Sequence, residues 1–323
     1  MKALLRSRHL PLLVTVFVLV ALYTTASILY PGFLSGRVIT NLFGDNASLG
    51  IAAIGMTLVI LSGGIDLSVG SVTGFTTVLI AMLIQQKGMH PLAAIGIALC
   101  AGTVFGAFMG FLIFRYELPP FLVTLGGLFF ARGMAFVISK ESLGIDHPFY
   151  NRLSDFAIPL GGKASLSTPA VIYVLLFGIG ILLTHYTGFG RNLYALGGSE
   201  PSARLMGVPI GPVKIKVYAV SGFCAALAGA VSTIYTGSGN PTMGVGFELD
   251  VIASVVIGGT LLTGGVGSQL GTLAGVLIFG TINTALNFNG GLDSSWLRIA
   301  IGGLLLIFIL IQRFLTRRPG LVR

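Results

Sequence analysis

The chain has 323 residues, of which 54% are hydrophobic and only 9% are charged, with a formal net charge of +9. A soluble domain carries about 25% charged residues because it needs a solvated shell, so this composition excludes a water-soluble globular protein. The basic excess does not indicate a nucleic-acid partner. The two cysteines, Cys100 and Cys224, lie far apart in apolar stretches and indicate neither a metal site nor a disulfide.

Apolar segments recur along the whole chain, and crossing ~30 Å of hydrocarbon takes about 20 such residues. The first segment continues to Tyr30 without a small-residue cleavage site, so we expect a retained signal anchor. The sequence predicts an all-α, polytopic transmembrane helical bundle of about ten spans, forming a single domain over residues 1–323. The predicted spans are 11–30, 46–62, 68–84, 91–114, 121–138, 168–185, 213–236, 249–262, 269–288 and 295–313.

The basic residues predict the orientation, since loops on the cytoplasmic side carry an excess of Lys and Arg. With both termini cytoplasmic, six basic residues fall outside and Arg132 falls within a span; the remaining twelve fall inside. This distribution predicts an N-in, C-in topology with a cytoplasmic loop at 186–212 and a periplasmic loop at 139–167. The inner residues are Lys2, Arg6, Arg8, Arg115, Arg191, Arg204, Lys214, Lys216, Arg313, Arg317, Arg318 and Arg323.

Two predicted spans, 46–62 and 249–262, are short and are followed by Gly-Gly pairs. The stretch from Leu61 through Gly63-Gly64 resembles the stretch from Leu262 through Gly264-Gly265, which indicates a weak internal repeat. Paired short, glycine-interrupted segments in two halves of a chain are typical of a transport site built from broken helices. The alternative is that two glycine-rich turns arose independently.

Asp66 follows the first Gly-Gly pair and precedes a predicted helix. A carboxylate at that position is suited to cap the helix by accepting hydrogen bonds from first-turn amides. The functional alternative places Asp66 and its neighbour Ser68 on the path of a solute.

Arg132 lies inside a predicted span, where a charge costs ~2.5–3.5 kcal/mol and therefore requires a partner or a water-filled cavity. The alternative is that its side chain extends to the outer interface. Glu248 and Asp250 open a short predicted span, and acids in a first turn favour the positive end of the helix dipole. The alternative for these two acids is a polar rim at the outer mouth of a pathway.

The predicted inner loop 186–212 contains a short helix at 200–206. Ser199 is suited to cap this helix, and Gly207 with Pro209 ends it. Glu200 and Arg204 stand four apart in the favourable acid-first order. A short two-faced helix at this position predicts a docking element. The alternative, a helix lying on membrane lipid, requires more bulky apolar side chains.

Sequence motifs of catalysis are missing from the chain. It has no glycine-rich phosphate loop followed by Lys-Ser or Lys-Thr, no His-Glu-x-x-His and no Gly-x-Ser-x-Gly. The four histidines are scattered. The sequence therefore predicts a non-enzymatic membrane protein.

At the inner loop the chain resembles a known family. The stretch 190–198 followed by 203–208 is similar to the coupling region of ribose/galactose-type ABC sugar importer permeases. The stretch 63–70, the Pro119-Pro120-Phe121 motif and the run from 246 to 260 resemble three further hallmarks in the same order. The outer loop 144–149 and the overall sequence are most similar to one permease of bacterial galactofuranose importers.

The resemblance implies a permease subunit of the bacterial inner membrane that forms half of a translocation pathway. It implies three kinds of partner: a second homologous permease, cytoplasmic ATP-binding subunits and a periplasmic sugar-binding protein. ATP and Mg are then bound by the partner ATPase, and this chain holds no cofactor, no catalytic residue and no metal. The implied ATPase-coupling residues are Gly190, Arg191, Tyr194, Ala195, Gly197, Gly198, Glu200, Arg204 and Gly207. The candidate pathway residues are Asp66, Ser68, Arg132, Glu248 and Asp250.

One departure from the family concerns docking. The family usually has Asn after the Gly-Gly pair and an Ala-Ala pair further on, whereas this chain has Ser199 and Ser202-Ala203. A docking surface specialised to a particular ATPase would explain the difference. The rival hypothesis for the whole chain is a secondary sugar transporter driven by an ion gradient, for which Asp66 is the main candidate ion site.

Overall fold

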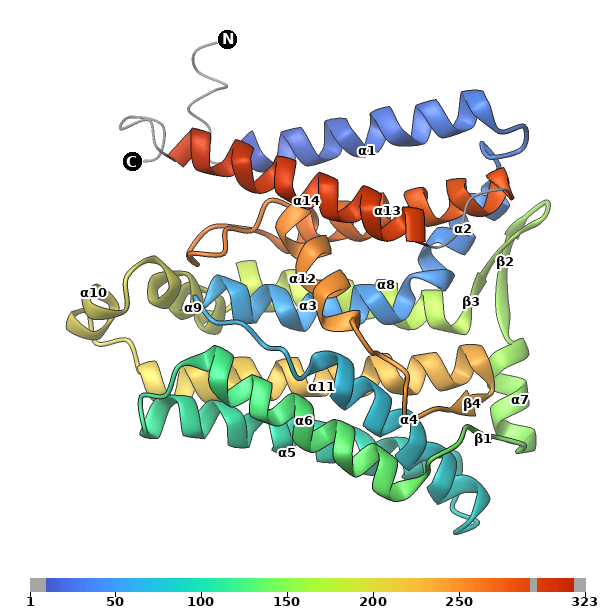
Figure 1. Ribbon diagram of the computed structural model, residues 1–323, viewed down its shortest axis with the longest axis horizontal. Coiled ribbons are helices and arrows are strands. Elements are labelled where there is room, and N and C mark those ends of the chain that lie inside the picture. The colour runs from blue at the N-terminus through green and yellow to red at the C-terminus, as the bar shows by residue number, and fades with distance from the viewer. Residues whose placement is uncertain (1–9, 291–294, 317–323) are drawn as a thin grey trace.

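The computed structural model describes residues 10–290 and 295–316, which form a bundle of helices with a few short strands (Figure 1). The helices are α1 (Leu10–Leu29), α2 (Gly36–Asp45), α3 (Ala47–Leu61), α4 (Val69–Gln85), α5 (Pro91–Arg115), α6 (Pro120–Ile138), α7 (Pro148–Asp155), α8 (Thr168–His185), α9 (Gly188–Gly198), α10 (Glu200–Leu205), α11 (Ile210–Thr236), α12 (Phe247–Ile257), α13 (Gln269–Asn289) and α14 (Ser295–Thr316). The strands are β1 (Leu143–Gly144), β2 (Ala157–Gly161), β3 (Ala164–Ser167) and β4 (Ser238–Gly239).

Each predicted span overlaps a helix, and the helical fold is confirmed, but the count of about ten spans is not. Within the described residues, six helices are long and apolar enough to cross a membrane: α1, α5, α6, α8, α11 and α13. The pair α2–α3, bent by 56°, makes a seventh if it counts as one span. Helix α4, with 17 residues, and the stretch 295–310 of α14 are apolar but too short to meet this length requirement, and α12 has only 11 residues.

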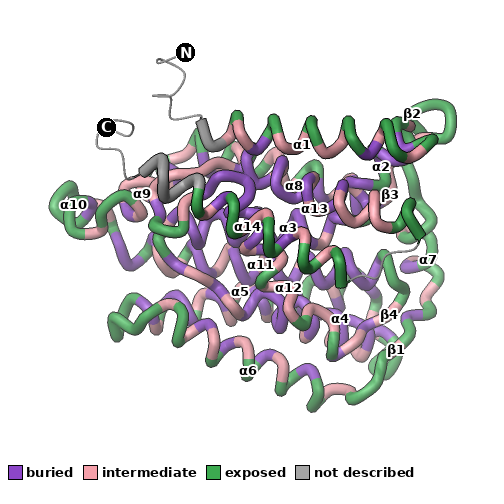
Figure 2. Tube along the Cα trace, turned by 45° about the horizontal axis from the view of Figure 1, so that its top comes forward, coloured by how far each residue is buried: buried purple, intermediate pink, exposed green. Residues whose placement is uncertain are grey.

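Helix α11 forms the centre of the bundle and packs against α3, α4 and α5. Small residues permit the close approach of α5, since a Cβ on Gly222 would collide with the carbonyl of Gly102. Helix–helix contacts in membranes favour such residues because they bring backbones together. Figure 2 shows the buried residues concentrated along α3 and α11, whereas α1 and α6 carry many exposed residues.

The two predicted loops lie at opposite ends of the bundle (Figure 1). The segment 139–167 forms β1, α7 and the β2–β3 hairpin, and β1 pairs antiparallel with β4. Tyr150 of α7 is buried with its hydroxyl 2.5 Å from that of Thr233, and burial raises the pKa of Tyr150 to about 12. The neutral side chain of Tyr150 therefore connects the segment 139–167 to α11 through a hydrogen bond.

The segment 186–212 forms α9 and α10 at the other end, where α1 begins and α14 ends (Figure 1). The predicted N-in, C-in orientation is not confirmed. Several basic residues on which it rests, namely Lys2, Arg6, Arg8, Arg317, Arg318 and Arg323, lie outside the described residues.

Candidate functional site

Three Gly-Gly pairs meet at the α9 end of the bundle, and we call them the glycine junction: Gly63-Gly64, Gly197-Gly198 and Gly264-Gly265. The amide of Gly265 donates a hydrogen bond to the carbonyl of Leu61 at 3.0 Å. A Cβ on Gly264 would lie 2.9 Å from the Cα of Gly63, and a Cβ on Gly265 would lie 2.8 Å from the Cα of Gly198. The segment 186–212 therefore touches both helix breaks through backbone atoms.

Helix α9, which the sequence analysis assigned to a loop, positions the Gly197-Gly198 pair. Thr187 caps α9 by accepting a hydrogen bond from the amide of Gly190 at 3.2 Å. Gly190 packs on the carbonyl of Thr184, where a Cβ would collide. Leu193 and Leu196 are buried in the core, and Ala195 packs against it. This packing fixes α9 to the bundle and presents Gly197 to the end of α3.

Helix α10 confirms the predicted short helix, which spans Glu200–Leu205 and ends one residue before the predicted 206. Ser199 caps it by accepting from the amide of Ser202 at 3.4 Å, and Gly207 ends it with a φ of +78°. Glu200 pairs with Arg204 at 3.5 Å, as predicted, and with Lys214 of α11 at 2.8 Å.

The end of α10 presents apolar side chains outwards. Leu205 is 90% exposed and the adjoining Met206 is 69% exposed. Large apolar side chains exposed on a short helix beside charged ones form a surface suited to a protein partner or to lipid.

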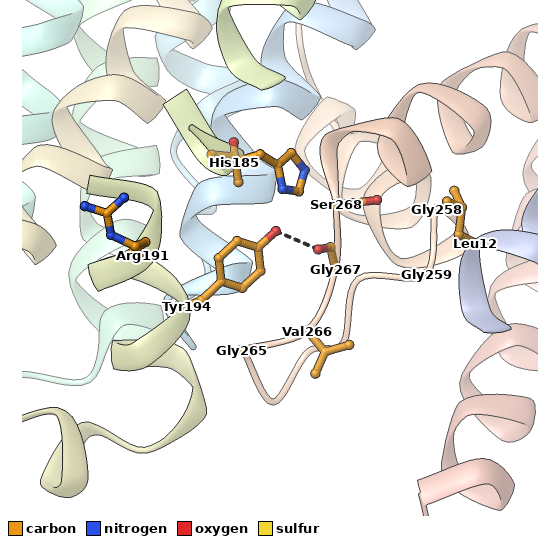
Figure 3. Close-up of a pocket in the computed structure, with 11 residues that line it drawn as sticks. Leu12, His185, Arg191, Tyr194, Gly258, Gly259, Gly265, Val266, Gly267 and Ser268 are labelled. Carbon is orange, nitrogen blue, oxygen red and sulfur yellow. Dashed lines mark hydrogen bonds between the residues drawn. The ribbon is translucent and has the colours of Figure 1, made fainter. Parts of the chain in front are cut away.

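A cavity of about 460 Å³ lies between α9 and the segment 258–268, beside the glycine junction (Figure 3). Tyr194 donates a hydrogen bond to the carbonyl of Gly267 at 2.8 Å across this cavity, and its ring stacks on His185. Arg191 also lines the cavity and is exposed. The cavity thus links the predicted coupling residues to the second helix break.

Asp66 is fully buried and accepts three hydrogen bonds. The amide and the hydroxyl of Ser68 donate at 2.9 and 2.6 Å, and the hydroxyl of Ser221 on α11 donates at 2.7 Å. Ser68 is itself the N-cap residue of α4. Asp66 therefore stabilises the start of α4 through its cap, rather than through the first-turn amides that the sequence suggested.

The guanidinium of Arg132 has partners within the protein, which favours the first of the two alternatives left by the sequence. Its Nη1 donates to the carbonyls of Pro241 and Met243 at 2.6 and 2.7 Å. These carbonyls belong to the segment 240–246, which leads to α12. The arginine thus binds the unwound approach to the second broken helix.

Glu248 and Asp250 lie in the first turn of α12, as predicted. A Cβ on Gly70 of α4 would collide with Oε2 of Glu248, and this buried oxygen has no hydrogen-bond partner among the described residues. Asp250 lines a second cavity.

The predicted site residues therefore form three groups. Gly197 and Gly198 belong to the glycine junction, and Arg191 and Tyr194 line the cavity beside it, whereas Glu200, Arg204 and Gly207 lie on α10 or at its end. Asp66 and Ser68 form a cluster with Ser221. Arg132 binds the segment that leads to α12, whose first turn holds Glu248 and Asp250.

Polar contacts that the sequence analysis missed hold the second break in place. Gln269 donates to the carbonyl of Ile54 at 3.2 Å, and the hydroxyls of Thr57 and Thr272 lie 2.7 Å apart. The internal repeat carried a signal for them, because it aligns Gln269 with Ser68.

Apolar helices around two helix breaks, 62–68 and 258–268, which meet at the glycine junction, are the arrangement of a polytopic membrane permease. The family described as "Branched-chain amino acid transport system / permease component" matches residues 38–310. The inner membrane ABC transporter permease protein YjfF of Escherichia coli K12 is 52% identical, covering 96% of this chain and 93% of that protein. No solved structure matches the chain.

Two further relatives cover most of the chain. The fructose import permease protein FruG of Bifidobacterium longum is 37% identical over 94% of this chain and 91% of its own. The ribose import permease protein RbsC of Bacillus subtilis is 39% identical over 89% of this chain and 88% of its own.

The chain belongs to this permease family, and within it to the ribose/galactose-type ABC importer permeases, as the sequence motifs predicted. It is a multi-pass inner membrane protein. Permease subunits of this family are non-catalytic, with the ATPase on partner subunits, so the chain is not an enzyme.

Proposed function

We propose that this chain forms half of the translocation pathway of an ABC importer for a monosaccharide, galactofuranose, driven by ATP hydrolysis on separate subunits. The observation that carries the proposal is full-length similarity to permeases whose names specify ribose and fructose import. The choice of galactofuranose rests on the resemblance of the outer loop 144–149, and of the overall sequence, to a permease of bacterial galactofuranose importers.

The proposed topology has ten crossings with both termini cytoplasmic. Helices α4 and α12 are too short to span a membrane alone, but each follows an unwound segment, 62–68 or 240–246, that extends its reach. Unwound backbone at membrane depth is tolerated against protein or water; Asp66 links the first segment to Ser221, and Arg132 binds the carbonyl of Pro241 in the second. The excess of inner basic residues supports the orientation.

The proposed coupling device is α10 together with the glycine junction. A partner ATPase would dock on α10 and on Arg191, and its motion would reach both helix breaks through α9. The glycines at the junction support this proposal. Because their backbones are in direct contact, with no flexible side chain between them, a displacement of one segment would displace the others. ATP binding can shift the permease from one conformation to another only if the ATPase makes different contacts with the two conformations.

The proposed assembly is a heterodimer with a second homologous permease, two ATP-binding subunits and a periplasmic sugar-binding protein. ATP and Mg remain on the ATPase. Membrane lipid surrounds the exposed helices, and no nucleic acid takes part.

Uptake of labelled sugars tests the proposal. Cells lacking this chain should lose uptake of galactofuranose but keep uptake of ribose and galactose, and a plasmid copy should restore it. Deletion of the ATPase subunit should abolish the restored uptake, whereas a protonophore that leaves ATP levels intact should not. Uptake that survives the ATPase deletion would favour an ion-driven secondary transporter. A fully active homodimer after purification would contradict the heterodimer.

A further inference from the structure

A second cavity, of about 310 Å³, lies apart from the one beside the glycine junction and reaches the surface at Asp45, which is exposed. It is formed by the α2–α3 bend, α4, α11, the end of the unwound segment 240–246, the first turn of α12 and α13. The residues that define its chemistry are Asp45, Asn46, Phe247, Asp250, Phe279 and Asn283.

The walls of this cavity combine hydrogen-bonding groups of both kinds with aromatic rings. Asp45 accepts a hydrogen bond from the hydroxyl of Tyr235 at 3.1 Å, and the amide nitrogen of Asn46 donates to the carbonyl of Leu42 at 2.9 Å. These contacts fix two side chains of the wall and leave acceptor capacity on each.

Two further polar groups in the wall are available to a ligand. Among the described residues, neither the carboxylate of Asp250 nor the amide of Asn283 forms a hydrogen bond, although Arg298 of α14 interacts electrostatically with Asp250. The carboxylate is an acceptor, and the amide both donates and accepts. Phe247 and Phe279 add apolar faces to the same space.

We propose that this cavity is a monosaccharide subsite contained within a single subunit. A sugar presents hydroxyl groups that donate to Asp250 and exchange hydrogen bonds with Asn283, and its ring offers C–H faces to Phe247 or Phe279. The volume lies at the lower end of the ~300–1,000 Å³ range of small-molecule pockets, so it suits one sugar ring and excludes longer saccharides. The inference rests on the proposed function, because it takes the solute to be a sugar.

The position of the cavity also supports a substrate site, because the cavity lies next to an element that would move during transport. Its wall includes Met243, whose carbonyl binds Arg132, and the first turn of α12, which is a broken helix. Half-helix starts next to unwound backbone are where transporters hold their substrates. A bound sugar would therefore contact the element that the glycine junction moves.

Cysteine protection in the complete importer tests the subsite. In a background carrying Cys100→Ser and Cys224→Ala, Ser48→Cys places a thiol in the cavity without removing a proposed ligand. Asn287→Cys places a thiol at the exposed end of α13, outside the cavity, as a control. The measured quantity is the alkylation rate by a small water-soluble reagent with galactofuranose, ribose or maltose present.

We expect galactofuranose at ten times its dissociation constant to slow alkylation of the Ser48→Cys variant about tenfold. Maltose should give no protection, and the Asn287→Cys variant should react at the same rate throughout. Adding Asp250→Asn, which keeps the shape of the side chain, should abolish the protection without changing the unprotected rate.

Absence of protection by galactofuranose, or equal protection by maltose, would overturn the subsite. So would equal protection of the Asn287→Cys variant. A wild-type importer that takes up sugar while the cavity remains unprotected would refute this site alone. A wild-type importer without sugar uptake would instead refute the proposed function.

Discussion

Gly63 and Gly264 lie with their backbones in contact, and both adopt the left-handed conformation, with φ of +82° and +85°. They occupy equivalent positions in the internal repeat, each as the first glycine of its pair. Glycines that end helices commonly adopt this conformation, so the shared φ alone does not distinguish a repeat from two independent turns. The contact between equivalent positions is what favours a repeat whose two helix breaks meet at one point.

The first prediction is that Gly264→Ala destabilises the protein. A left-handed φ costs an alanine about 1–2 kcal/mol, and the added Cβ would also press on the backbone of Gly63. Gly178→Ala on α8 is the control, because open space surrounds that position. Thermal unfolding in detergent should separate the two variants, and equal midpoints would contradict the close contact.

The second prediction concerns the adjacent glycines at the end of α9. Gly197→Ala would drive a Cβ into the carbonyl oxygen of Leu61, which is backbone and cannot rotate away, whereas Gly198→Ala enters open space. We expect the first variant to lose stability or uptake and the second to resemble wild type. Both are measured as uptake per folded protein. Wild-type stability and uptake in the Gly197→Ala variant would show that α9 does not pack tightly against the end of α3.

The third prediction tests docking at the same place. Gly198→Trp and Arg191→Glu should leave the fold intact, because both positions are exposed, but should uncouple ATP hydrolysis from uptake. The measurements are ATPase activity and uptake in the assembled importer. Normal uptake in both variants would remove segment 186–212 from the ATPase interface.

Local patterns predicted much of this structure, because capping and hydropathy act over a few residues. They identified every apolar helix, the cap at Ser199 and the end of α10 at Gly207. They missed α9, whose buried leucines alternate with glycines and polar residues as in a loop. They also missed α2, an amphipathic helix that begins at a Ser35 cap.

Contacts between segments far apart in the chain could not be predicted from the sequence. Nothing near Asp66 indicates that Ser221 would donate to it, and nothing near Arg132 identifies the carbonyls of Pro241 and Met243 as its partners. Such pairs depend on how helices pack in three dimensions. In the same way, a Gly-Gly pair predicts a turn, but it does not predict which other turns of the chain that turn will contact in the glycine junction.

The fourth prediction distinguishes the two transport hypotheses at Asp66. Asp66→Asn keeps one oxygen for the two Ser68 bonds, and the hydroxyl of Ser221 can rotate to accept from the new amide. We expect ATP-dependent uptake to persist in this variant. Asp66→Ala should cost about 1–3 kcal/mol of stability because buried donors lose their acceptor. Loss of uptake in a well-folded Asp66→Asn variant would point to an ion-binding carboxylate.

The fifth prediction is that Arg132 holds the unwound segment 240–246 in place. Arg132→Met removes two hydrogen bonds from a charged donor, each worth about 1.5–3 kcal/mol, and leaves the carbonyls of Pro241 and Met243 without that donor. Amide hydrogen exchange across 240–246 should therefore accelerate. Arg115→Met, at an exposed position, should leave it unchanged.

Cysteine labelling adds a direct test of the direction in which the arginine points. In the cysteine-free background, Arg132→Cys should react with a water-soluble reagent and not with a lipid-dissolved one, because the side chain faces the unwound segment. Labelling from lipid alone, together with unchanged exchange in Arg132→Met, would mean that the arginine extends to the membrane interface. The start of α12 would then depend on Glu248 and its neighbour Gly70 on α4, and no charged side chain would hold the segment 240–246.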